Sequence, residues 1–252
     1  VLRKTVSKLS CSFFWLCHRA DVAIYIEKCD VCAKHHRGKP PKQGLLTTPQ
    51  TDGPWDRIAI DITGPHPKSR NGYKYILTCI DLFSKYVLAV PIRNHQAPNV
   101  AAVLLDKIFS VYGLPNQILS DRGPEFQSEL LRCLCKYLNI TKLNTSPYEP
   151  RTNGCVERFH RTLNSIIAKH VHMNQRNWDE WLQFCVVAVN STESVSTKFT
   201  PFYLMFGREF RGVSEMQFGL NVPHTEQLTL HEWVKERASR LEEAFSLASE
   251  EL

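Results

Sequence analysis

The fold is decided by an alternating stretch that runs from residue 55 to residue 62, WDRIAIDI. In an extended chain, Ile58, Ile60 and Ile62 lie on one face, and Ala59 and Asp61 lie on the other. This alternation predicts a half-buried β-strand that carries a carboxylate near its end.

The elements after this strand predict a mixed sheet. Asn71-Gly72 is a strong turn signal, and β-rich runs follow at residues 73–80 and 86–90. Further on, the pattern predicts a helix at 98–112, a strand at 117–120, a helix at 128–138 and a strand at 141–145. The last two strands follow helical crossovers and should run parallel to a neighbour. The order βββαβαβ therefore predicts an α/β fold with a five-stranded sheet flanked by helices.

Three carboxylates occupy comparable positions in these elements. Asp61 ends the first strand, Asp121 follows the fourth, and Glu157, separated from Asp121 by 35 residues, lies in the first turn of a predicted helix. If the fourth strand lies beside the first, Asp61 and Asp121 lie at the same end of strands about 4.8 Å apart. Such oxygen ligands suit a hard divalent cation. The alternative is that they are ordinary solvated acids among the 25 of the chain.

The helix predicted at residues 155–170 has an apolar stripe that should face the sheet. On its other side lie Glu157, Arg161 and Asn164, with His160 at the edge. Glu157 can thus reach over the strand ends, although a carboxylate in a first turn also interacts favourably with the helix dipole. The stripe consists of Val156, Phe159, Leu163, Ile166 and Ile167.

Residues 11–36 predict a small helical unit within an N-terminal domain of residues 1–36, and a basic linker rich in Pro and Gly follows at 37–54. Cys29 and Cys32 form a C-x-x-C pair, which can supply half of a tetrahedral zinc site. The local candidates for further ligands have no convincing spacing; they are Cys11, Cys17, His18, His35 and His36. The pair is therefore half of a zinc site completed before Val1, or two buried thiols.

The remaining chain predicts a core that continues to residue 190 and an extension at 191–252, irregular up to about residue 228 and helical from 230. No run of 18 apolar residues occurs, so no membrane span is expected. Nine scattered cysteines suit a reduced, intracellular protein. The net charge of the chain is +6, and residues 191–252 have a net charge of −4. The positive charge therefore lies in residues 1–190, which favours a polyanionic partner for that part of the chain. Because the chain begins with Val1, we interpret it as a piece of a longer product.

Several of these motifs together resemble the integrase core of retroviruses and gypsy-type LTR retrotransposons. The carboxylate spacing corresponds to the D, D, 35, E signature of that family. The segment after the core, with Asn190-Ser191-Thr192, Thr200-Pro201-Phe202 and Phe206-Gly207-Arg208, also resembles the gypsy-type proteins. The core motifs are Asp61-Ile62-Thr63-Gly64-Pro65, Ser120-Asp121-Arg122-Gly123, Tyr148-x-Pro150-x-Thr152-Asn153-Gly154 and Glu157-Arg158.

The resemblance implies an RNase H-like fold and a role for each matching residue. Asp61, Asp121 and Glu157 would be the catalytic ligands of two Mg²⁺ or Mn²⁺ ions. DNA contacts would come from Tyr148, Asn153 and Arg161, and Lys169, Lys142, Lys39 and Lys42 are further basic candidates. Cys29 and Cys32 would belong to a His-His-Cys-Cys zinc domain whose histidines lie at or before the start of the chain. Glu149 and Arg151 depart from the family, where His and Gln are common.

The implied function is metal-dependent 3′-end processing and strand transfer of retrotransposon DNA into host DNA, by a fragment of a Pol polyprotein. The implied partners are element and target DNA and further copies of the chain, with the nucleus as the place of action. Two alternatives stay open. One is a domesticated or decayed copy that binds nucleic acid without catalysis, and the other is a related nuclease that only hydrolyses.

Overall fold

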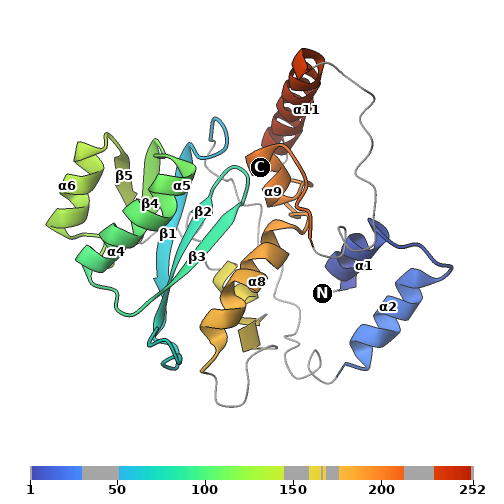
Figure 1. The fold of residues 1–252 in the computed structure, drawn as a ribbon, viewed down its shortest axis with the longest axis horizontal. Helices are drawn as coiled ribbons and strands as arrows, with labels where there is room; N and C mark the ends of the chain where they lie inside the picture. Colours follow the sequence, from blue (N-terminus) through green and yellow to red (C-terminus); the bar gives the residue numbers. More distant parts are fainter. Residues whose placement is uncertain are drawn as a thin grey trace. The chain divides into compact units, whose positions relative to one another are not determined.

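The computed structural model describes residues 2–29, 51–144, 159–165, 167–168, 176–212 and 230–250, with the side chains of 230–234 left out. The chain divides into two compact units. One unit spans Pro41–Val189, and the other combines Val1–Pro40 with Asn190–Leu252. Both units are drawn in Figure 1.

The unit Pro41–Val189 is built on a five-stranded mixed sheet in the order β3-β2-β1-β4-β5 (Figure 1). β1 pairs antiparallel with β2, and β2 antiparallel with β3, whereas β4 is parallel to both β1 and β5. The predicted parallel direction of the last two strands is therefore confirmed, and β4 lies beside β1, which is the condition set for the approach of Asp61 to Asp121. The strands are β1 (Arg57–Thr63), β2 (Tyr75–Asp81), β3 (Val87–Ile92), β4 (Gln117–Ser120) and β5 (Thr141–Asn144).

The crossover predicted as one helix at 98–112 consists of three successive helical stretches, α4 (Ala97–Val103), η1 (Leu104–Phe109) and α5 (Ser110–Tyr112). η1 is a π-helix that buries Leu104, Ile108 and Phe109, and its wider turn suits apolar residues spaced four and five apart. Gly113, with φ of 84°, ends the helix, as glycine permits. The sequence did not predict the π segment.

The second crossover is α6 (Glu129–Tyr137), which begins at Ser128. The Ser128 side chain accepts a hydrogen bond from the Leu131 N–H, a typical N-terminal cap. α6 contacts both α4 and β5. These helices lie on one side of the sheet, and α8 (Trp178–Asn190) lies on the other (Figure 1).

The α8 side of the sheet holds a continuous apolar cluster that includes Ala59 and Leu119 from the strands and Leu182 from α8. Residues 159–165 and 167–168 are helical, and Phe159, Leu163 and Ile167 are buried in this cluster. The predicted apolar stripe is confirmed at these three positions. By the alternation of a strand, Asp61 shares the face of Ala59, so this helix crosses the face that carries the first carboxylate.

Strand β2 ends in a fully buried acid, Asp81. Its carboxylate accepts hydrogen bonds from the Trp55 N–H (3.1 Å), the Ser84 N–H (2.8 Å) and the Ser84 hydroxyl (2.5 Å). Burial raises the pKa of the Asp81 carboxyl, and these donors oppose the rise. Asp81 pairs with Ile58 near the start of β1, three positions before Asp61. Asp81 therefore lies beside the first residues of β1, whereas Asp61 lies toward the end of that strand.

The segment between β1 and β2 is fastened to the start of α8. Asn71 Nδ2 donates to Asp179 Oδ2 at 2.8 Å, and Trp178 Nε1 donates to the Pro67 carbonyl at 2.7 Å. The Arg70 N–H also donates to the Arg176 carbonyl at 2.9 Å. These contacts fix the chain that leaves β1 just beyond Asp61.

The other unit contains α1 (Leu2–Ser10), α2 (His18–Glu27), α9 (Pro201–Phe206) and α11 (Leu230–Glu250). Leu204 of α9 is buried with Ala244 and Ala248 of α11. The sequence predicted an irregular segment at 191–228, and α9 corrects this prediction. Pro201 and Gly207, interpreted as signs of irregularity, are the first residue and the left-handed terminator of this helix. α1 was not predicted either.

None of the helices in the described part of the chain combines the length and the apolar character that a membrane crossing requires.

Candidate active site

The two aspartates lie at matching positions on neighbouring parallel strands. Ile60 of β1 pairs with Ser120 of β4, and Asp61 and Asp121 each follow directly. Neighbouring strands are about 4.8 Å apart. The adjacency predicted from the sequence therefore holds for the backbone at both positions.

Each aspartate gives one oxygen to a nearby main-chain donor. Asp61 Oδ1 accepts from the Ile62 N–H at 2.9 Å, and Asp121 Oδ1 accepts from the Gly123 N–H at 2.9 Å. Both residues are half-buried, and the Asp61 side chain is 17% exposed. These local bonds orient the carboxylates without removing them from solvent.

Gly123 allows the chain to fold closely over Asp121. A Cβ atom at this position would lie 3.0 Å from Asp121 Oδ1 and 2.9 Å from Glu125 Oε1. A side chain would therefore displace one of these acids. The spacing of Asp121 and Gly123 in the sequence thus has a local steric reason.

His160 reaches the first carboxylate from the helix that crosses the sheet. Its Nδ1 lies 3.4 Å from Asp61 Oδ2, and its Nε2 lies 3.0 Å from the Thr78 hydroxyl oxygen. Thr78 pairs with Asp61 across β1 and β2. Burial, with a smaller contribution from His66, lowers the pKa of His160 to about 4. The ring is therefore neutral near pH 7, and its contact with Asp61 is not an ion pair.

The sequence placed His160 only at the edge of its helix and gave it no role. Its partners are on strands more than eighty residues earlier in the chain, so no local pattern could identify the contact. The available signal was its position three residues after Glu157, which is about one helical turn.

The donor set of Asp61 and Asp121 fits a hard divalent cation. Carboxylate oxygens are the ligands that Mg²⁺ and Mn²⁺ prefer. Within the described ranges, no group of three His, Cys, Asp or Glu residues forms a metal cluster. Glu157, the third predicted ligand, lies outside those ranges.

Several other predicted site residues also lie outside the described residues: Cys32, Tyr148, Asn153 and Lys169. Arg161 is described and exposed, on the side of the helix away from the sheet, as the sequence predicted. Cys29 follows α2 and is half-buried. Among the local zinc candidates, His18 has its Nε2 3.2 Å from Ser10 Oγ. The zinc site therefore stays a prediction.

The sequence of the chain is similar to retroviral and retrotransposon proteins. Residues 52–150 match the integrase core domain family. The chain is 32% identical over 249 residues to a retrovirus-related Pol polyprotein from transposon 412 of Drosophila melanogaster, covering 98% of this chain and 20% of that protein. It is 29% identical over 212 residues to gypsy retrotransposon integrase-like protein 1 of Homo sapiens, covering 82% and 39%. The chain thus spans only a part of these relatives.

Two solved structures have a similar fold. The HTLV-2 integrase catalytic core domain in complex with magnesium, in its dimeric form, matches with a TM-score of 0.51 and 20% identity, covering 62% of this chain and 99% of that one. A chain of the simian T-cell lymphotropic virus intasome in complex with PP2A regulatory subunit B56 gamma matches with a TM-score of 0.54 and 20% identity, covering 90% and 75%. The five-stranded mixed sheet is therefore the RNase H-like sheet of retroviral integrase cores.

Proposed function

Residues 52–150 are the core domain of a retroviral-type integrase of the kind found in gypsy-type retrotransposons, and we propose that this chain processes and transfers DNA ends. The proposed reaction is metal-dependent 3′-end processing, followed by strand transfer of retrotransposon DNA into host DNA. The chain would act as part of a Pol polyprotein product. The observation that carries this proposal is the juxtaposition of Asp61 and Asp121 on the parallel pair β1 and β4.

Asp61, Asp121 and Glu157 would hold the divalent ions, Mg²⁺ or Mn²⁺. When bound, such ions supply Lewis-acid activation of an attacking oxygen and stabilisation of the leaving oxygen in phosphoryl transfer. The attacking groups are water in processing and the freed 3′-hydroxyl in strand transfer, so the chain supplies no nucleophile of its own. A separate zinc ion would take Cys29 and Cys32 as two of its ligands.

His160 would act as a positioning residue for Asp61. The neutral ring lies between Asp61 Oδ2 and the Thr78 hydroxyl, and its helix is anchored by Phe159 and Leu163 in the apolar cluster. The imidazole can thereby fix the direction of the second Asp61 oxygen, while the Ile62 N–H fixes the first. Groups that orient metal-binding carboxylates in this way usually affect metal affinity and activity.

The proposed partners are element ends and target DNA, bound by Arg161, Tyr148, Asn153 and Lys169, together with further copies of this chain. The positive charge of residues 1–190 supports a polyanionic partner. The HTLV-2 core described as dimeric and trimeric supports an oligomer by analogy. We place the activity in the nucleus, because the proposed target is host DNA.

The test is a strand-transfer assay with Mg²⁺, in which the chain joins a labelled duplex with a recessed 3′-hydroxyl to a plasmid. We expect joined products from the wild-type chain and none from Asp121→Asn, with equal DNA binding by both. Cleaved DNA fragments without joined products would indicate a related nuclease that only hydrolyses DNA. DNA binding without either product would indicate the non-catalytic copy and would overturn the proposal.

A further inference from the structure

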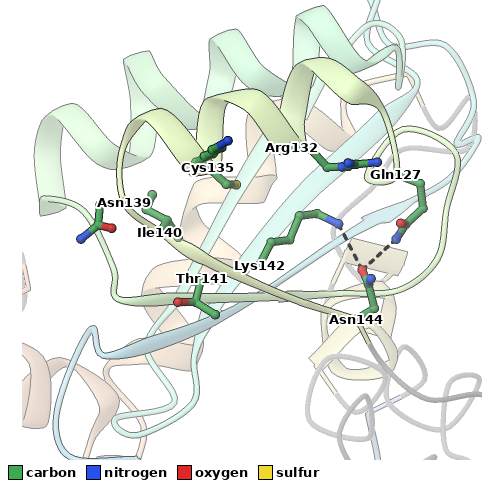
Figure 2. A pocket seen from close by; sticks show the side chains of 9 residues that line it. Gln127, Arg132, Cys135, Asn139, Ile140, Thr141, Lys142 and Asn144 are labelled. Atoms are coloured by element: carbon green, nitrogen blue, oxygen red, sulfur yellow. Dashed lines mark hydrogen bonds between the residues drawn. The ribbon is translucent and has the colours of Figure 1, made fainter.

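A polar cleft of about 630 Å³ opens between α6 and β5, on the side of the sheet covered by α6 (Figure 2). Its volume is in the range of ligand-binding sites. Helix α6 provides one wall, and β5 with the segment before it provides the other. The lining residues are Gln127, Arg132, Cys135, Lys136, Asn139, Ile140, Thr141, Lys142 and Asn144.

The lining is cationic. It contains Arg132, Lys136 and Lys142, and no acidic residue is among the described residues that form it. The nearby Glu129 lies 3.6 Å from Arg132, but these side chains are 75% and 65% exposed, so their pairing is weak. The remaining polar groups are amides and one hydroxyl, which can donate hydrogen bonds to oxygen anions. The cleft therefore suits an anionic ligand rather than a cation.

Two hydrogen bonds fix the end of the cleft that lies toward the Asp61 and Asp121 carboxylates. Lys142 Nζ donates to Asn144 Oδ1 at 3.1 Å, and Gln127 Nε2 donates to the same oxygen at 2.7 Å. Figure 2 shows both side chains converging on Asn144, with Arg132 nearby. Asn144 pairs with Ser120, the residue before Asp121. This end of the cleft thus lies at the same sheet edge as the aspartates.

The cations are close enough to influence one another and Asp121. Burial lowers the pKa of Lys142, and the charge of Arg132 contributes in the same direction, whereas Asp121 and Cys135 oppose it. Gln127 Nε2 also approaches the Asp121 carbonyl at 3.5 Å. A partly buried ammonium beside a guanidinium is unfavourable, and a bound anion would relieve this repulsion.

We propose that this cleft binds the backbone phosphates of duplex DNA and guides the strand toward Asp61 and Asp121, an inference that rests on the proposed function. Lys and Arg side chains with amide donors are typical phosphate-contacting groups that position DNA without reading its sequence. Single-stranded binding sites usually stack bases on aromatic rings, and no aromatic residue lines this cleft in the described chain. The lining therefore favours a duplex backbone over splayed bases.

The experiment measures fluorescence anisotropy of a labelled duplex with the 252-residue chain, without divalent metal, over a series of salt concentrations. The variant combines Arg132→Gln, Lys136→Gln and Lys142→Gln. Because each phosphate contact contributes about 0.9 to the slope of log K against log salt, we expect the slope to fall by roughly 2 to 3. Affinity should fall about equally for unrelated duplex sequences.

The matched control removes three exposed cations outside the cleft, by Lys107→Gln, Lys235→Gln and Arg240→Gln. Its slope should stay near that of the wild type, and a variant with Lys136→Arg and Lys142→Arg should retain wild-type binding. Circular dichroism reports folding of each variant. If the triple variant does not fold, the exposed Lys136→Gln alone should lower the slope by about 1.

The outcomes separate this inference from the proposed function. Equal slopes for the cleft variant and the control would overturn the proposal that the cleft binds DNA phosphates, and strand transfer by the wild-type chain would still support the proposed function. A lower slope for the cleft variant alone supports phosphate binding in the cleft, even if the wild-type chain fails to join DNA. Preferential loss of binding to a single-stranded oligonucleotide, with duplex binding unchanged, would contradict the proposed ligand.

Discussion

Two aspartates of the same sheet differ in how their carboxylates are bound. Asp81 is fully buried, and three donors from Trp55 and Ser84 occupy its oxygens. Asp61, toward the other end of β1, is half-buried, and its contacts include the Ile62 N–H at Oδ1 and the His160 ring at Oδ2. The donors around Asp81 hold the β2–β3 turn to the start of the domain, whereas Asp61 retains access to solvent.

This difference shows that the surroundings of a carboxylate indicate its role better than its residue type does. An acid enclosed by donors stabilises the fold, because removing it leaves buried N–H and O–H groups unsatisfied. A partly exposed acid beside a second acid can bind a cation. This assignment can be tested by replacing each acid, by replacing the ring beside Asp61, and by adding metal.

Asp61→Asn should give the largest effect. The change removes a charge from the proposed metal ligands, and we expect strand transfer to fall by at least about 1,000-fold, equivalent to about 4 kcal/mol in the activation barrier. Thermal stability should stay unchanged or increase, because a repulsion with Asp121 is removed. Rates are measured in the strand-transfer assay and stability by calorimetry. Activity close to wild type would contradict the catalytic role of Asp61.

Asp81→Ala should instead destabilise the domain. It leaves the Trp55 N–H and both Ser84 donors without their acceptor in a buried turn. We expect the free energy of unfolding to fall by about 3 kcal/mol, as measured by urea denaturation. The matched control is Asp106→Ala, at an exposed position, which should change stability by less than about 0.5 kcal/mol. Equal stability of the two variants would show that the Asp81 network is dispensable.

His160→Ala should have an intermediate effect on activity. Loss of a group that orients a metal-binding carboxylate typically lowers activity or metal affinity by about 10- to 100-fold. Mn²⁺ affinity, measured by calorimetric titration, should weaken along with strand transfer. His160→Gln should recover part of the loss, since an amide can still reach Asp61 and Thr78. Unchanged Mn²⁺ affinity in the alanine variant would leave His160 with only a packing role.

Addition of metal should stabilise the folded chain without changing any residue. A ligand that binds only the folded chain raises its stability by RT ln(1 + [L]/Kd), about 2.7 kcal/mol at a concentration of 100 Kd. We expect Mn²⁺ to raise the melting temperature of the wild-type chain and not that of the variant with both Asp61→Asn and Asp121→Asn. A chelator should reverse the shift. An equal rise in the two proteins would place the metal elsewhere.

The parallel direction of β4 and β5 followed from the sequence, because each of these strands comes after a helical crossover. The placement of β4 beside β1 was only a condition in the sequence argument, and the structure supplies it. The buried positions of Phe159, Leu163 and Ile167 were also predicted, because helical periodicity is a local property.

The features that the sequence did not reveal depend on distant partners or on backbone detail. Asp81 has no spacing that distinguishes it from the solvated acids, and its role depends on Trp55, 26 residues earlier. The His160 contacts join a helix to two strands across the sheet. The basic cleft combines residues from α6, β5 and Gln127, and only Lys142 was singled out beforehand. The π segment η1 reflects packing of the crossover that periodicity alone does not specify.

The most direct test of the account is anomalous diffraction from crystals of the 252-residue chain soaked in Mn²⁺. The account predicts a manganese peak within coordination distance of carboxylate oxygens from both Asp61 and Asp121, and no such peak at Asp81. Manganese bound elsewhere, with the Asp61 and Asp121 carboxylates directed away from each other, would contradict the central claim.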